Sequence, residues 1–287
     1  MSRQTAAGVG FVFFAALLWS FSGLVIVTAA TSPLWIIFIR SLTAGIILSP
    51  FIFKRKITPT KLILIAGTFF FIFQVSSVVC MLTGTAALAV SMQASAPIYT
   101  IIFCFFATKY LPIKKLLAFL FLLAGIGLAL YDSWNYISPI AAVLGVIVGA
   151  SFVVYTAALQ KFETGRVMGI IAGINLVTAF LTLLVLPLDF YPVPSNFQTL
   201  SVLVLAGIIF IAGGYTLYGN GVKRVRIEVV LLIGLIEPVL LPLWVYIGIG
   251  EVPNMMMIFG MMFILVGAVL NIFSPIVQKE KKIEISI

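Results

Sequence analysis

The sequence predicts an all-α integral membrane protein of ten transmembrane helices, built as two inverted five-helix repeats with both termini in the cytoplasm. Of its 287 residues, 63% are hydrophobic and only 9% are charged, whereas soluble domains carry about a quarter charged residues. A spanning helix needs about 20 mainly apolar residues, and such runs follow one another along nearly the whole chain. The runs are continuous, which favours helices over the alternating strands of a membrane β-barrel.

Ten apolar runs define the expected helices. They cover residues 8–29, 33–53, 62–82, 87–108, 115–131, 139–160, 167–188, 199–220, 229–249 and 254–275. The polar segments between them are too short for a sizeable soluble domain. Residues 1–134 are therefore expected to form the first repeat and residues 135–287 the second, within one integrated membrane domain.

The basic residues predict the orientation of these helices. With a cytoplasmic N-terminus, 16 of the 17 Lys and Arg residues fall in the inner segments, and the seventeenth, Arg40, lies inside the second helix. Positive residues favour the cytoplasmic side of a membrane. Because the net charge of +9 is explained by these loops, it does not indicate a nucleic-acid partner, and the lipid bilayer of the cell membrane is the expected surroundings.

A weak internal repeat relates the two halves. When Pro97 is placed over Pro238, the segment Ala89–Pro112 runs parallel with Val230–Pro253. Five helices per half is an odd number, so the second half must enter the membrane from the opposite side. Inverted repeats of this kind are typical of secondary transporters, whose substrate site lies near the bilayer midplane between the halves.

Three segments resemble the EamA branch of the drug/metabolite transporter superfamily. They are Ala-Ala-Leu-Leu-Trp-Ser at 15–20, Phe-Ile-Arg-Ser-Leu-Thr-Ala-Gly around Arg40, and the stretch from Leu235 to Glu251 that contains Leu-Ile-Glu-Pro-Val. The chain departs from the family pattern at Lys109-Tyr110, where the first repeat often has Gly-Glu. The resemblance covers nearly the whole chain and implies a central cavity lined mainly by helices 1, 3, 4, 6, 8 and 9, through which metabolites or drugs move.

Glu237 is the acidic residue expected near mid-membrane. A charged side chain there costs about 3 kcal/mol or more unless it is paired or wetted, so such residues are functional candidates. Pro97, Pro238 and Pro242 remove backbone donors and predict helix breaks, and those at Pro97 and Pro238 fall at equivalent places in the two repeats. The sequence leaves open whether Glu237 handles substrate or protons, or only stabilises the break. For Arg40 the sequence favours snorkelling toward the outer surface over pairing with Glu237 or a substrate carboxylate.

Other polar and aromatic side chains fall on shared faces of the expected cavity helices. Packing between helices is the ordinary role of each pair, but their concentration predicts a pocket for a neutral or zwitterionic solute. With Glu237, the candidate substrate-binding residues are Trp19, Ser22, Gln74, Ser77, Ser91, Ser95, Tyr99, Ser151, Tyr155, Tyr215, Tyr218 and Trp244. Gly149 lies on the sixth helix as an expected point of close packing.

A secondary transporter fits this pattern better than an enzyme or a channel. The sequence has no His, its two cysteines lie in apolar runs, and neither a metal cluster nor a cofactor motif is visible. No filter sequence or nucleotide-binding loop indicates a channel or ATP drive. The expected function is export of amino acids or related small metabolites by alternating access. A proton-coupled drug exporter or an uptake carrier of the same fold is the alternative, and the oligomeric state stays open, with a monomer compatible.

Overall fold

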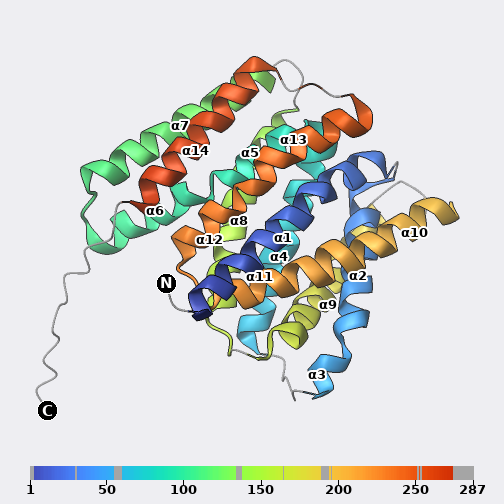
Figure 1. Cartoon of the computed structure of the whole chain (residues 1–287). Helices are drawn as coiled ribbons and strands as arrows, with labels where there is room; N and C mark the ends of the chain where they lie inside the picture. Colours follow the sequence, from blue (N-terminus) through green and yellow to red (C-terminus); the bar gives the residue numbers. More distant parts are fainter. Residues whose placement is uncertain are drawn as a thin grey trace, which may run out of the picture.

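The computed structural model describes residues 3–29, 31–54, 60–133, 138–163, 165–188, 194, 196–250, 252 and 254–273. Every regular element in these residues is a helix (Figure 1). In chain order they are α1 (Arg3–Thr28), α2 (Pro33–Leu48), α3 (Pro50–Lys54), α4 (Lys61–Thr83), α5 (Ala86–Ala94), α6 (Ala96–Thr108), α7 (Ile113–Ser133), α8 (Pro139–Gln160), α9 (Val167–Val185), the short η1 (Leu186–Leu188), α10 (Phe197–Ala206), the π-helix η2 (Gly207–Gly214), α11 (Tyr215–Val222), α12 (Ile227–Gly234), α13 (Ile236–Ile249) and α14 (Met255–Ile272).

Within the described residues, nine helical segments are long and apolar enough to cross a membrane. A shorter apolar helix, Met255–Asn271, lies where the tenth span is predicted. The observed ends agree with the predicted ones to within three residues, except that α1 begins at Arg3 instead of residue 8. The prediction of an all-helical protein with many apolar segments of membrane-spanning length is therefore confirmed for the described residues, and helices are the form in which such segments satisfy their backbone groups in a bilayer.

Local sequence explains where several of these helices begin. Ser32, Thr60, Thr85 and Ser138 each accept a hydrogen bond from a backbone N–H in the first turn of the following helix. Such side chains satisfy one of the orphan donors at a helix N-terminus. Pro33 and Pro139 then occupy the first turns of α2 and α8, where their missing N–H costs nothing.

The helices pack as a bundle in which sequence-distant segments are neighbours. The helix α4 packs along α8 and α9, α2 lies against α9 and η2, and α1 lies between α13 and α11. The helices α7 and α14 pair at one edge of the bundle (Figure 1). The interior of the bundle is thus bounded by α1, α2, α4, α5, η2 and α13, and this arrangement positions the polar side chains described below.

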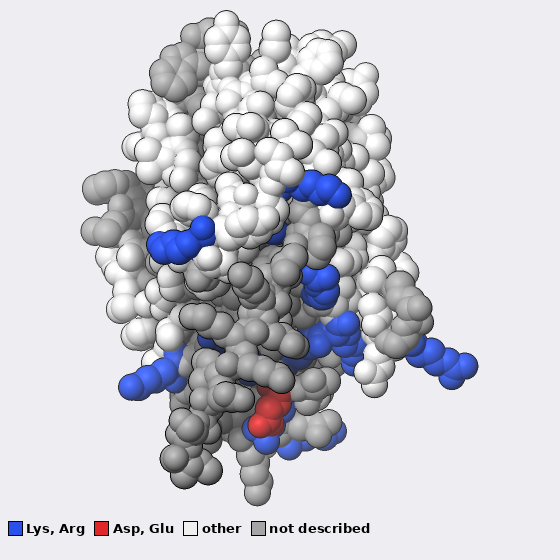
Figure 2. Space-filling model, turned by 90° about the vertical axis from the view of Figure 1, so that its left-hand side faces the viewer, with Lys and Arg blue, Asp and Glu red and all other residues white. Residues whose placement is uncertain are grey.

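Basic side chains gather at one end of the bundle. The start of α9 at Arg166 lies beside Lys54, and the Arg224 guanidinium lies 4.9 Å from the ring centroid of Phe11 on α1. In the view of Figure 2 the visible Lys and Arg side chains lie over the middle and lower part of the molecule, and the upper part carries none. This is the distribution expected of a protein whose loops on one side are positive.

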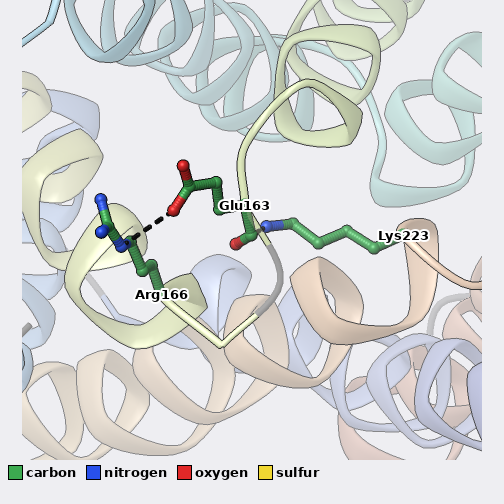
Figure 3. Close-up of polar contacts among 3 residues, drawn as sticks. All are labelled: Glu163, Arg166 and Lys223. Atoms are coloured by element: carbon green, nitrogen blue, oxygen red, sulfur yellow. Dashed lines mark hydrogen bonds and ion pairs between the residues drawn. The ribbon is translucent and has the colours of Figure 1, made fainter.

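Two loops at the basic end are joined through Glu163 (Figure 3). Its carboxylate lies 3.1 Å from Arg166 Nε in an exposed ion pair, and its backbone oxygen accepts a hydrogen bond from Lys223 Nζ. Burial lowers the pKa of Lys223 to about 8, and the nearby Glu163 carboxylate offsets part of this effect. The segment that follows α8 is therefore tied to the end of α11.

This contact predicts a pH-dependent contribution of Lys223 to stability. The folded protein releases the Lys223 proton near pH 8, whereas the unfolded chain releases it near 10.5. The unfolded state therefore binds more protons between these values, and the contribution of Lys223 to folding rises with pH in that window and is constant below it. In detergent, the melting temperature of the wild type relative to Lys223→Gln should increase between pH 8 and pH 10. A difference that does not change with pH would contradict the lowered pKa of the half-buried Lys223.

Candidate functional site

Two spanning segments are interrupted near the middle of the bundle. The first changes from α5 to α6 at Ser95, two residues before Pro97, and the second changes from α12 to α13 at Leu235, three residues before Pro238. At both places the backbone N–H bonds to the carbonyl three residues earlier, as Ser95 to Met92 and Leu235 to Leu232. Proline supplies no donor to continue the regular ladder, which accounts for both interruptions.

The third predicted break is wrong. Pro242 lies inside α13, and this helix continues through it to Ile249. A single lost hydrogen bond is tolerated in a membrane helix when its neighbours support it. Here Leu241, beside Pro242, is fully buried against Gly23 of α1, so packing against α1 holds the helix in place.

A small polar cavity lies beside the two interruptions. Its volume is about 30 Å³, which is room for about two water molecules. The described lining residues come from α1, α2, α4, α5, η2, α11 and α13; they are Trp19, Ser22, Ile26, Arg40, Phe73, Gln74, Ser77, Val78, Met81, Gln93, Ile211, Tyr215 and Glu237. A polar cavity of this kind inside an apolar bundle is where a transport site is expected.

Glu237 and Gln93 connect the two interrupted segments across this cavity. Gln93 Nε2 donates a hydrogen bond of 2.8 Å to Glu237 Oε2, and both side chains are buried. Gln93 lies in the last turn of α5, and Glu237 lies in the first turn of α13. No ion pair of Glu237 occurs among the described residues. An amide therefore partners the carboxylate, and a cationic group of a solute would have an oxygen of Glu237 to approach.

Arg40 does not snorkel, contrary to the sequence-based expectation. Its side chain is 3% exposed, lines the cavity, and donates from Nη2 to Ser22 Oγ at 3.1 Å. A Cβ at Gly207 would lie 2.7 Å from the Arg40 carbonyl oxygen, so the glycine lets α2 approach η2 closely. Because of this close approach, α2 forms part of the cavity wall. The family resemblance does not place this second helix among the cavity helices.

The π-helix η2 presents a backbone acceptor to the cavity wall. Trp19 Nε1 donates to the carbonyl oxygen of Phe210 at 3.0 Å. The Trp19 ring also packs on Tyr215 and Tyr218, with centroid distances of 4.4 and 5.0 Å. Segments of π-helix are frequent at functional sites. The indole of Trp19 is thereby held in one orientation beside the cavity.

The structure brings six of the thirteen predicted binding residues together in the cavity and places seven elsewhere. The six are Trp19, Ser22, Gln74, Ser77, Tyr215 and Glu237. Tyr155 and Tyr218 pack in the neighbouring aromatic cluster, and Ser151 bonds to its own helix. Ser91 and Ser95 bond to the backbone of α5, Tyr99 donates to the Val146 carbonyl oxygen, and Trp244 donates to Ser20 Oγ while stacking on Phe21.

Sequence reasoning missed Gln93 as a site residue and misplaced Arg40. The sequence could have indicated Gln93, because it is an amide in the turn before a proline break. It indicates Arg40 more strongly, because a cation inside a membrane segment is a functional candidate by default. In the described part of the chain no group of three or more His, Cys, Asp or Glu side chains could hold a metal, and Cys80 and Cys104 are buried free thiols.

Comparison with known proteins identifies a solved structure with a similar fold. No protein-family model matches the sequence, and no curated protein matches it either. A solved structure described as "Crystal structure of protein" is similar, with a TM-score of 0.68 and 20% sequence identity over 95% of this chain and 98% of that chain. At this identity the likeness shows a shared arrangement of helices along nearly the whole of both chains.

Proposed function

We propose that this protein is a secondary transporter of the EamA type that moves small zwitterionic solutes, such as amino acids, across the cytoplasmic membrane. One observation carries the proposal: a polar cavity beside two interrupted helices holds both Arg40 and Glu237 inside a mainly apolar bundle. Burying two ionisable groups in a membrane is costly. A solute that carries both charges would compensate each of them.

The closed state of the cavity supports alternating access. Its volume of about 30 Å³ is too small for an amino acid, so a solute could enter only after helices move apart. The large side chains of Ile26, Phe73, Val78, Met81 and Ile211 are among those that line the cavity and close around it in this state.

The packing pattern supports the inverted five-plus-five organisation. In that organisation, each span of the first half corresponds to the span five places later. The contact of α4 with α8 then corresponds to the contact of η2 and α11 with α1. The contact of α1 with α13 likewise corresponds to that of α8 with α5 and α6. The pairs α2 with α9 and α7 with α14 would map onto themselves. A binding site at the centre of such a pseudo-symmetric bundle suits a transporter.

Counterflow tests the proposal directly. Purified protein in liposomes preloaded with a mixture of unlabelled amino acids should take up the corresponding labelled amino acid faster than protein-free liposomes do. The same vesicles should be offered labelled organic cations, because transport of these instead would favour the drug-exporter alternative. Absence of counterflow for every amino acid would contradict the proposed function.

Orientation in the membrane is a separate prediction. In a variant lacking Cys80 and Cys104, a cysteine at Tyr110 should react with a membrane-impermeant thiol reagent only from the cytoplasmic side. A cysteine at Val252 should react only from outside. Both positions are well exposed in the structure. Reaction of both from the same side would contradict the ten-span topology with a cytoplasmic N-terminus.

A further inference from the structure

The cavity contains hydrogen-bond donors that have no partner among the residues the structure describes. Arg40 has five N–H groups, of which one on Nη2 reaches Ser22, and its Nε and Nη1 have no hydrogen-bond partner. Gln74 Nε2 also has none. Both side chains are more than nine-tenths buried and line the same cavity. No ion pair of Arg40 occurs among the described residues.

These unpartnered groups share one chemical character. Buried polar groups are nearly always hydrogen-bonded, and a guanidinium without an anion is the costliest case. Water can serve the donors of Arg40 and Gln74 when the site holds no solute. The planar guanidinium matches the two oxygens of a carboxylate, and each of its two edges keeps free donors after Ser22 is bonded. A carboxylate is therefore the group whose acceptors fit this wall of the cavity.

We infer that Arg40 and Gln74 form the subsite for the carboxylate of the transported solute and so determine which solutes the protein accepts. The inference rests on the proposed transport function and specifies its substrate class. Glu237, held by Gln93 in the same cavity, is then the group left for the ammonium. Organic cations that lack a carboxylate would leave the donors of Arg40 unpartnered and would meet its positive charge. The protein should therefore reject simple amines and cationic drugs.

Matched probes separate the carboxylate from the rest of the solute. Wild-type protein in liposomes should exchange L-leucine and L-phenylalanine, and should exchange leucinamide, phenylalaninamide and phenylethylamine at least about 10-fold more slowly. The amides keep the side chain and the ammonium but lose the negative charge. Exchange of the amides or of phenylethylamine as fast as the amino acids would overturn the carboxylate subsite and leave the transport function standing. Exchange of none of the five compounds would overturn both.

Variants of the two donors test the assignment to these residues. Arg40→Gln should slow amino-acid exchange by about 100-fold, the scale for removing one partner of a buried charge pair, and should leave the slow exchange of the amides unchanged. Gln74→Ala should slow amino-acid exchange by about 10-fold, and Arg40→Lys should recover part of the activity lost in Arg40→Gln. Ser41→Ala is the control, because Ser41 is buried next to Arg40 but does not line the cavity.

The melting temperature separates this role from a structural one. Arg40 has a single hydrogen-bond partner among the described residues, so its removal should leave the melting temperature unchanged or raise it. L-Leucine or L-phenylalanine should raise the melting temperature of the wild type and not that of Arg40→Gln. Normal amino-acid exchange by folded Arg40→Gln and Gln74→Ala proteins would overturn the inference. Loss of folding in Arg40→Gln combined with normal exchange by Gln74→Ala would overturn it as well.

Discussion

Glu237→Gln is expected to slow amino-acid exchange by about 30-fold or more while leaving the amount of folded protein unchanged. Removing one charge of a buried, hydrogen-bonded pair costs about 2–5 kcal/mol, and about 1.4 kcal/mol corresponds to a tenfold change. The new side-chain carbonyl can still accept the hydrogen bond that Gln93 Nε2 donates to Glu237 Oε2 in the wild type. The fold therefore keeps its contact across the two interrupted helices, and the cavity loses its negative charge.

The outcome of this substitution distinguishes three roles of Glu237. Loss of exchange in liposomes, with a normal melting temperature, indicates contact with the ammonium of the solute. Loss of proton-driven accumulation with normal exchange would instead indicate that Glu237 carries the coupling proton. If both assays match the wild type, Glu237 only holds the break, and the zwitterion site must be abandoned. The control is Gln93→Leu, which removes the donor and should lower the melting temperature because it leaves Glu237 without its amide partner.

Gly149→Leu is expected to have the largest effect on folding. A Cβ at this position would lie 2.7 Å from Ser95 Oγ, 2.7 Å from Tyr99 Cε2 and 3.0 Å from the Met92 carbonyl oxygen. Gly149 of α8 therefore packs directly against the turn that joins α5 to α6. A leucine there must displace backbone as well as side chains, and overpacking of this kind costs about 3 kcal/mol or more. The yield of monodisperse protein and the melting temperature should both fall.

Gly127→Leu is the matched control for this change. Gly127 lies on α7, and a Cβ there has no atom within 4 Å, so the larger side chain projects into open space on the bundle surface. Its melting temperature should stay close to that of the wild type. Equal stability of Gly149→Leu and Gly127→Leu would show that α8 does not pack against the break as described.

Much of the fold was predictable because a bilayer leaves the backbone few choices. Each apolar run of about 20 residues must form a helix to satisfy its own N–H and C=O groups, and the observed helices follow the predicted runs closely. The interruptions before Pro97 and Pro238 also follow from local covalent structure, since proline has no N–H to donate. Pro242 shows the limit of that argument, because packing of α13 against α1 preserves the helix around it.

Which residues line the cavity was less predictable from the sequence. In a membrane protein both the lipid-facing and the packed faces of a helix are apolar, so periodicity does not mark which face looks inward. Serines on such faces satisfy themselves by bonding to their own helix, as Ser91 and Ser151 do, and need no cavity. The sequence therefore predicts polar faces on these helices, but only some of the predicted residues meet in the cavity.

The sequence by itself determined the helical class, the approximate limits of the apolar segments and the interruptions before Pro97 and Pro238, and it singled out Glu237 as a candidate functional residue. Each of these depends on neighbouring residues along the chain and on the general demands of a bilayer. The tertiary structure alone decided that Gln93 meets Glu237, 144 residues away, and that Arg40 points into the cavity with unpartnered donors. These facts depend on how closely α2 approaches η2 and on which helix ends come together, and no local pattern encodes such distances.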